Sequence, residues 1–382
     1  MDSLKVQFPE TILFGAETLQ KLASTVRHYG DRVLLVSESV LHEGNHIGNA
    51  QDLMVREGID VLLFDELMPG STAAAVDEVL SLARASKAKA IVGMGGMRVL
   101  SIAKTAAAIA SGKHSINELL NGGGRFDAPL PYIEVPSSYR NHFMLRDAVI
   151  LKDGVSKDFR ILKVPNNTTK AVVVDTSLTH TLSQKYAVSA MMDTLLAAVE
   201  GYLSNASNVL SDTVLIKAVR LLKEAILGSV RSPADMRYRR RASEAGLLTA
   251  MGLSQSEQGV GGAISYAVNS RFEVPKSWVA TVLLPHILET HVSHRAEKLS
   301  DISGALGETV DGIMPEEDAQ RSVRAVRRML GMIELPSRLR DLDLSMDDLA
   351  ELSAIVADTE MARKAALSFS TERITQLLKT AF

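Results

Sequence analysis

The sequence contains no cysteine, and this absence excludes disulfide bonds, thiolate metal ligands and cysteine nucleophiles together. Because disulfides belong to oxidising compartments, a chain without them is expected to be cytoplasmic. Long hydrophobic runs are also missing, since no stretch approaches the roughly 18 uninterrupted apolar residues of a membrane-spanning helix. The N-terminus lacks a basic start followed by an apolar segment, so we expect neither an export signal nor a membrane partner.

A large excess of charge of one sign is absent too. The 42 basic and 45 acidic residues leave a formal net charge of −3, whereas nucleic acids and anionic surfaces are bound through clustered positive charge. One basic cluster, at residues 237–241, is isolated, and we interpret it as a solvated helix face, with a specific anion site as the alternative. The expected partner is a small molecule rather than a nucleic acid.

The chain has 382 residues, of which 46% are hydrophobic. This length and composition are typical of a globular protein with two domains. Between residues 32 and 136, short apolar runs alternate with helical patterns, which predicts a parallel sheet with crossover helices. Residues 148–162 look like a β-hairpin around Asp153 and Gly154. Residues 170–178 look like a last buried strand.

After Leu178 the strand signals fade and long segments of helical apolar periodicity follow. The predicted fold is an α/β Rossmann-like domain over residues 1–178 and an all-helical domain over residues 179–382, with an active cleft between them. Ligands of open α/β sheets bind at the carboxyl ends of the strands. We therefore expect the ligand near the loops that follow Val36, Val92 and Val135.

A glycine-rich turn follows one of these strands, in AIVGMGGMRVLSIAK. Backbone N–H groups and a helix dipole can hold a phosphate there, although glycines also serve tight turns in many folds without a ligand. The segment resembles the GGGS-x-x-D-x-A-K signature of the iron-containing alcohol dehydrogenase family, which includes maleylacetate reductases, with Ala103 and Lys104 at its end. Three further stretches are similar in order, among them residues 260–289 with the family's Leu-Pro-His.

The resemblance implies the dehydroquinate synthase-like fold of that family, a bound NAD(P) and a homodimer. Glu38 stands where the family reads the adenosine ribose, and its carboxylate would accept hydrogen bonds from the ribose and repel a 2′-phosphate, which favours NAD over NADP. A solvated glutamate at a strand end is the alternative. The predicted cofactor-binding residues are Glu38, Gly95, Gly96, Met97, Arg98, Ser137 and Ser138.

The glycine loop departs from the family signature at three positions. Met97 replaces the third glycine, Arg98 the serine and Ser101 the aspartate. Met97 adds a side chain where the backbone should approach the pyrophosphate. Arg98 could compensate for this change by forming two hydrogen bonds to a phosphate, or its side chain could fold outward into solvent.

A further segment, residues 136–144, resembles the family's P-T-T-x-G-T-G-S-E motif beside the nicotinamide. Here Arg140, His142 and Phe143 stand where the family has small residues. They would narrow the nicotinamide pocket or line one of a different shape. His142 could serve as a general acid or base, although a lone loop histidine is more often a surface residue.

The resemblance implies a metal held by one aspartate and three histidines, but only the aspartate, Asp193, is present. The histidine positions hold Ala197, Gly262 and Lys276, and Tyr266 replaces a further histidine beside the substrate. One carboxylate cannot hold a transition metal, and an ammonium repels a cation. We therefore expect no catalytic metal.

Lys276 and Tyr266 could take over the role of the metal, because an ammonium or a phenol can donate a hydrogen bond and a proton to a carbonyl oxygen. Alternatively, Lys276 forms a structural ion pair with Asp193 and Tyr266 packs over it. The predicted catalytic residues are Lys276, Tyr266, His142 and Asp193.

The favoured function is a metal-independent, NAD(P)-linked oxidoreductase acting on a small carbonyl or alcohol. Because fold does not dictate function, two alternatives remain open. One is a non-redox enzyme that catalyses an elimination, condensation or isomerisation with the same acid–base groups. The other is a non-catalytic scaffold. Binding of a nicotinamide cofactor separates the first function from the others.

Overall fold

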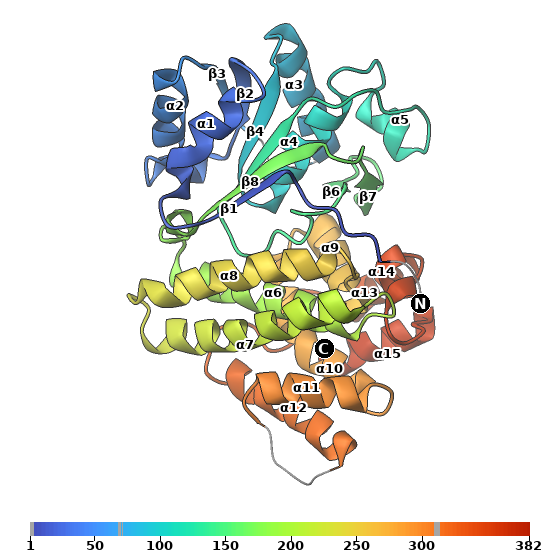
Figure 1. Ribbon diagram of the computed structural model, residues 1–382. Coiled ribbons are helices and arrows are strands. Elements are labelled where there is room, and N and C mark those ends of the chain that lie inside the picture. The colour runs from blue at the N-terminus through green and yellow to red at the C-terminus, as the bar shows by residue number, and fades with distance from the viewer. Residues whose placement is uncertain (1–3, 68–69, 71, 309–313) are drawn as a thin grey trace. The chain divides into compact units, whose positions relative to one another are not determined.

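The computed structural model describes residues 4–67, residue 70, residues 72–308 and residues 314–382. The chain divides into two compact units, which meet in sequence between Thr181 and Leu182. The first is a sheet with helices, and the second is made of helices alone (Figure 1). None of the described helices combines the length and the apolar character needed to cross a membrane.

The first unit is built on a six-stranded sheet in the order β1-β8-β5-β4-β2-β3, with every neighbouring pair parallel. The central strands β4 and β5 are buried along their whole length, as parallel strands covered on both faces should be. The strands are β1 (Thr11–Gly15), β2 (Arg32–Val36), β3 (Asp60–Phe64), β4 (Ala90–Gly95), β5 (Tyr132–Pro136) and β8 (Thr169–Asp175).

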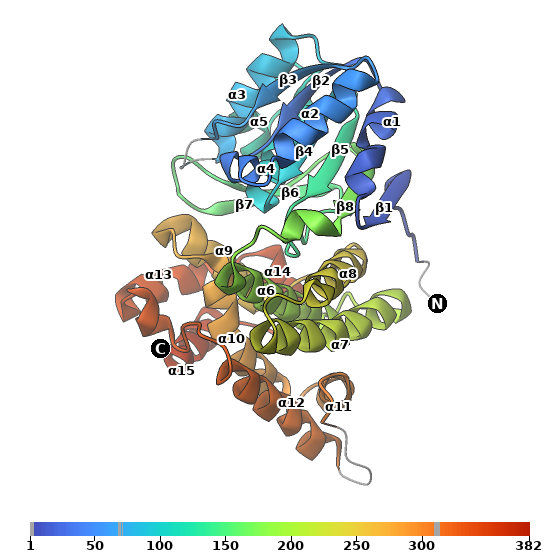
Figure 2. The ribbon, with the colours of Figure 1, turned by 90° about the vertical axis from the view of Figure 1, so that its left-hand side faces the viewer.

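Helices lie on both faces of this sheet (Figure 2), and each face packs into its own hydrophobic core. Leu34 and Val36 of β2 enter one core and Val33 and Leu35 the other, because successive side chains of a strand point to opposite faces. The first core also contains α3 (Thr72–Ala85), α4 (Met97–Ile109) and α5 (Ile116–Leu120); the second contains η1 (Thr18–Lys21), α1 (Leu22–Arg27), η2 (Ser39–His42) and α2 (His46–Arg56).

The predicted hairpin is confirmed as the antiparallel pair β6 (Ala148–Lys152) and β7 (Phe159–Lys163). Its turn is fixed by Asp153, whose Oδ1 accepts hydrogen bonds from the backbone N–H groups of Val155 at 2.7 Å and Ser156 at 3.1 Å. A side chain that bonds the backbone two and three residues on is a common turn device.

The helices of the second unit surround α6, which is buried on all sides from Ala187 onward. A helix that is apolar around its whole circumference belongs in the centre of a helical domain. The helices are α6 (Gln184–Leu203), α7 (Val209–Arg231), α8 (Met236–Leu253), α9 (Val260–Phe272), α10 (Lys276–His291), α11 (Ala296–Ala305), α12 (Pro315–Leu330), α13 (Met346–Ala357), α14 (Glu360–Lys364) and α15 (Thr371–Ala381).

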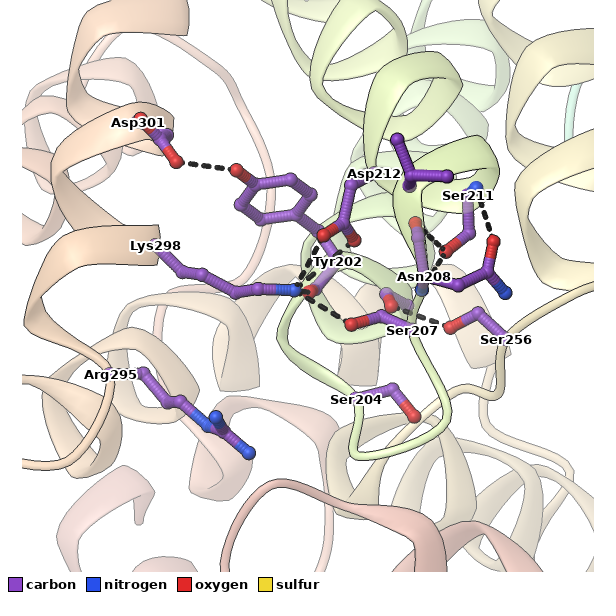
Figure 3. A network of polar contacts seen from close by, with 12 residues as sticks. Tyr202, Ser204, Ser207, Asn208, Ser211, Asp212, Ser256, Arg295, Lys298 and Asp301 are labelled. Atoms are coloured by element: carbon purple, nitrogen blue, oxygen red, sulfur yellow. Dashed lines mark hydrogen bonds and ion pairs between the residues drawn. The ribbon is translucent and has the colours of Figure 1, made fainter. Parts of the chain in front are cut away.

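A polar network ties α11 to the ends of α6 and α7 (Figure 3). The Lys298 ammonium donates to the Tyr202 carbonyl at 2.6 Å, to Ser207 Oγ at 2.7 Å and to the Asp212 carboxylate at 3.0 Å. The Tyr202 hydroxyl donates to Asp301 at 2.5 Å. All three ammonium protons therefore have acceptors, which is the full donor capacity of a lysine.

The interpretation of residues 237–241 as a solvated face is wrong for Arg239. Its side chain is buried and donates to the carbonyl of Leu182 at 3.1 Å. Arg239 shares one face of α8 with the buried Ala242 and Gly246, because residues three, four and seven apart align on a helix. Its neighbour Arg241 points outward and pairs with an exposed glutamate on α7.

Candidate functional site

Several predicted cofactor residues meet where β4 runs into α4. Gly95 ends the strand with a φ of +155°, and a Cβ there would lie 3.1 Å from the Glu38 carboxylate. Gly96 precedes the first turn of α4, and its N–H donates to Glu38 Oε1 at 2.7 Å. Ser137, after β5, donates from Oγ to the same carboxylate oxygen at 3.5 Å. Glu38, Gly95, Gly96 and Ser137 thus lie together, while their role in binding a cofactor stays a prediction.

Glu38 places a negative charge at the N-terminus of α4, where the helix dipole favours an anion. The carboxylate is engaged with the glycine loop, so the alternative of a solvated glutamate at a strand end is wrong. The preceding Ser37 is buried and donates to the Met94 carbonyl at 2.9 Å, which joins the ends of β2 and β4. The local geometry of Glu38 is therefore set by two neighbouring strands.

Met97 and Arg98 form the first turn of α4 and are both half-buried. Arg98 donates from Nη1 to the Leu67 carbonyl at 3.3 Å, so the alternative in which it folds outward into solvent is wrong. Burial lowers the pKa of Arg98, and the nearby Glu38 opposes this effect. Ser138 is half-buried in the loop that follows β5.

The loop after β5, residues 137–147, is packed inward rather than exposed; we refer to it as the second loop. His142 and Phe143 are each 2% exposed, so the expectation of a surface position for His142 is wrong. Arg140 is half-buried. Lys104 of α4 lies beneath the loop and donates hydrogen bonds to two of its carbonyl groups.

Lys104 is buried and bonds the second loop from inside. Its ammonium donates to the carbonyls of Phe143 at 3.0 Å and Arg146 at 2.8 Å, and it lies 3.9 Å from Glu134 Oε2 on β5. Asn141 donates from its amide to Glu134 Oε1. Burial lowers the pKa of Lys104, and burial raises the pKa of Glu134 to about 7.

Sequence reasoning missed the role of both residues. It treated Lys104 only as the end of a signature and did not single out Glu134. A glutamate inside the otherwise apolar run YIEVP was the available signal, because a charged residue is almost never fully buried without a partner.

In the helical unit the structure brings together three predicted catalytic residues. Asp193 lies on α6, Tyr266 on α9, and Lys276 is the first residue of α10. The Lys276 ammonium forms a buried ion pair with Asp193 and lies 4.3 Å from the centroid of the Tyr266 ring. A cation is unfavourable at a helix N-terminus, so Asp193 offsets both the dipole and the burial. The ion pair expected as the structural alternative is present.

Two further buried side chains adjoin Gly262 at the start of α9. The Glu200 carboxylate accepts from the N–H groups of Gly261 at 2.6 Å and Gly262 at 2.9 Å, and burial raises its pKa to about 7. A Cβ on Gly262 would lie 3.0 Å from Gln258 Nε2. Among the described residues, that nitrogen has no hydrogen-bond acceptor. Sequence reasoning missed Glu200, which lies on α6, and Gln258, which lies just before α9.

The residues present do not fit a transition metal. Asp193 is paired with an ammonium, Ala197 one turn later is apolar, and Gly262 has no side chain. No cluster of three or more histidine, cysteine, aspartate or glutamate side chains suited to a metal occurs in the described ranges. A stable site needs three or four such ligands.

A glycine loop at the carboxyl edge of a parallel sheet, followed by a helical unit, defines the class as a dehydrogenase-type two-unit fold. The model of iron-containing alcohol dehydrogenase matches residues 9–176. The model of the C-terminal part of the Fe-containing alcohol dehydrogenase family matches residues 187–382. The chain belongs to the iron-containing alcohol dehydrogenase family.

Individual relatives agree over nearly the whole length. Lactaldehyde reductase of Escherichia coli K12 is 22% identical over 98% of each chain. The solved structure of a 1,3-propanediol oxidoreductase superposes with a TM-score of 0.94, 20% identity and full coverage of both chains. The solved structure of sulfoacetaldehyde reductase from Bifidobacterium kashiwanohense in complex with NAD+ superposes with a TM-score of 0.87 and 17% sequence identity. The match covers 100% of this chain and 99% of the other. The predicted fold class is confirmed.

Proposed function

We propose that this protein is a metal-independent, NAD-linked oxidoreductase that reduces a small carbonyl compound or oxidises the corresponding alcohol. Its family consists of alcohol dehydrogenases. The observation that carries the metal-independent part is the buried ion pair between Lys276, at the position of an expected histidine ligand, and Asp193, at the position of the aspartate ligand. A fixed ammonium there supplies the positive charge that a Lewis acid would otherwise supply.

The choice of NAD rests on Glu38 and on the relatives. Its carboxylate, held on the Gly96 N–H, is available to the ribose hydroxyls and would repel the 2′-phosphate of NADP. The sulfoacetaldehyde reductase was solved with NAD+. The bound cofactor would supply a hydride to the carbonyl carbon.

In the direction of reduction, the chain's own residues act on the carbonyl oxygen. The Lys276 ammonium stabilises the negative charge that develops on this oxygen, and Lys276 or the Tyr266 hydroxyl delivers the proton that completes the alcohol. Asp193 keeps the buried ammonium charge-balanced and orients it. Gln258 offers a further amide donor near Gly262. The catalytic role of His142 stays a prediction.

The test is calorimetric titration with NADH and NAD+, combined with elemental analysis of the same sample. We expect dissociation constants below 1 mM, which corresponds to about −4 kcal/mol, with no stoichiometric metal, and NADH oxidation with a panel of small aldehydes. Binding weaker than millimolar would contradict the proposal, and activity that requires stoichiometric iron or zinc would contradict its metal-independent part.

One observation favours a second candidate, a non-redox enzyme. The second loop buries His142 and Phe143, where the family resemblance implies small residues, and this would change the shape of a nicotinamide pocket. Turnover without any nicotinamide would support this candidate. We further propose that the ligand is a small molecule rather than a nucleic acid. The homodimer, the cytoplasmic location and the shared cleft stay predictions.

A further inference from the structure

The second loop has almost no regular backbone structure of its own between β5 and β6. Its internal backbone hydrogen bonds are short-range, from the Met144 N–H to Asn141 at 3.4 Å and from the Arg146 N–H to Phe143 at 3.2 Å. The first of these bonds is long, and a turn of this kind does not fix a loop by itself. The shape of the loop therefore depends on the side chains beneath it.

We propose that Lys104, Glu134 and Asn141 are positioning residues that hold the second loop in the shape needed to receive a nicotinamide ring. The proposal rests on the proposed function, because it assigns the loop to the cofactor. We call these three residues the loop clamp. None of them is proposed to touch the substrate.

The lysine end of the clamp uses three acceptors. Two are carbonyls of the loop that accept hydrogen bonds, those of Phe143 at 3.0 Å and Arg146 at 2.8 Å. The third group is the Glu134 carboxylate, which forms an ion pair at 3.9 Å. An ammonium has three protons, so its hydrogen-bonding capacity is directed mainly at the loop. The two carbonyls are three residues apart, and their separation is thereby fixed.

The glutamate end extends the clamp to the middle of the loop. Glu134 Oε1 accepts from the Asn141 amide, and Asn141 Oδ1 in turn accepts from the Phe143 N–H at 3.3 Å. His142 lies between these two bonded residues in the chain. Its backbone is therefore held on both sides, which orients the imidazole of a predicted catalytic residue.

The beginning of the second loop is tied to the glycine loop. The Ser137 N–H donates to the Gly95 carbonyl at 3.0 Å, and its hydroxyl approaches Glu38 at 3.5 Å. Lys104 itself lies on α4, the helix that the glycine loop opens. One helix thus positions both predicted cofactor loops.

Apolar packing could hold a loop down without the cost of burying an ammonium and a carboxylate. Lys104 is 2% exposed and Glu134 1% exposed. Directional bonds to named carbonyls fix the loop in one arrangement, whereas apolar contacts permit several. We infer that this single arrangement is what the cofactor requires.

The test compares Lys104→Met with a matched control, Lys298→Met. Lys298 also bonds a backbone carbonyl and a carboxylate, but in the helical unit. Hydrogen–deuterium exchange is followed on peptides that cover residues 137–147, and NADH affinity, KM and kcat are measured on the same samples. We expect exchange in the loop to rise about tenfold or more in Lys104→Met only, because the loop opens locally.

We also expect KM for NADH to rise about tenfold in Lys104→Met, equivalent to ~1.4 kcal/mol, with a smaller change in kcat. Unchanged loop exchange would overturn the clamp. Faster exchange with wild-type NADH affinity would overturn its positioning role. Failure of the wild-type protein to bind NADH would refute the proposed function instead, and loop exchange would still decide whether the clamp exists.

A milder set of variants covers the case in which Lys104→Met does not fold. Asn141→Ala removes only the loop side of the clamp, while Glu134→Gln keeps an oxygen for Asn141 and Glu134→Ala keeps none. We expect loop exchange and KM for NADH to stay near wild type in Glu134→Gln and to rise in Glu134→Ala and Asn141→Ala. Equal effects of Glu134→Gln and Glu134→Ala on both readouts would contradict the proposal.

Discussion

At the scale of single residues, the central question is whether Lys276 of the helical unit has a structural or a catalytic role. Its ammonium is buried against Asp193 and Tyr266, and Lys276 occupies a position that the family resemblance assigns to a metal ligand. The ion pair by itself is compatible with a structural role or a catalytic one. Variants that separate stability from catalysis distinguish the two.

Lys276→Met leaves the Asp193 charge buried without its partner. We expect it to lower the free energy of unfolding by about 3 kcal/mol and to lower kcat of the carbonyl reduction by about a hundredfold or more. The double variant Lys276→Met, Asp193→Leu removes both charges, so it should regain most of the stability but none of the activity. Urea unfolding and steady-state kinetics measure the two quantities. Recovery of activity in the double variant would assign Lys276 a structural role.

Glu38 is expected to set the preference between the two nicotinamide cofactors. In Glu38→Gln the amide oxygen can still accept from the Gly96 N–H, but the charge that repels a 2′-phosphate is gone. The preference for NADH over NADPH should fall by about tenfold, or ~1.4 kcal/mol. Calorimetric titration with both cofactors measures it. The exposed Glu43 provides the control variant Glu43→Gln, which should bind both as the wild type does.

At the scale of elements, α9 begins on a buried carboxylate instead of a side-chain cap of its own. Glu200 accepts from the N–H groups of Gly261 and Gly262, and burial raises its pKa to about 7 from 4.5. The folded state therefore binds this proton more tightly than the unfolded state does. The stability that depends on the proton is complete below about pH 4.5 and is lost as the pH rises through 7.

This gives a prediction for the pH dependence of stability. Deprotonation of Glu200 should lower the free energy of unfolding by about 3 kcal/mol between pH 4.5 and pH 8. The variant Glu200→Gln cannot titrate, so its free energy of unfolding should fall less over this range than that of the wild type. Urea unfolding at both pH values provides the comparison. An identical pH dependence in the two proteins would show that Glu200 does not titrate in this range.

The elements were largely predictable from sequence, and the site only in part. Alternating apolar runs and helical periodicity located the strands, the hairpin and the helical half, because burial imposes those patterns. The helix after the glycine loop begins at Met97, with Gly96 as its N-cap residue. Glu200 escaped prediction because its partners, Gly261 and Gly262, lie about sixty residues away in the sequence and meet it only in the folded chain.

At the scale of the whole molecule, we predict that removing metal ions changes neither the activity nor the stability of the protein. We expect dialysis against a chelator to leave both NADH-dependent activity and the melting temperature unchanged, the latter within about 1 °C. The physical reason is that a bound ion would stabilise the native state by mass action, and the part of the chain that the structure describes contains no group of three or more side chains suited to hold one. Activity that disappears with the chelator and returns with Fe²⁺ or Zn²⁺ would contradict it.

The Lys276–Asp193 pair also has a consequence for how the protein matures in the cell. The Lys276 ammonium is part of the polypeptide, so it is in place as soon as the chain folds. It needs no import, no chaperone and no insertion step, and it cannot be oxidised to a higher valence or exchanged for a competing ion. Under the proposed function, the site would therefore mature in the same way whatever iron the cell has available.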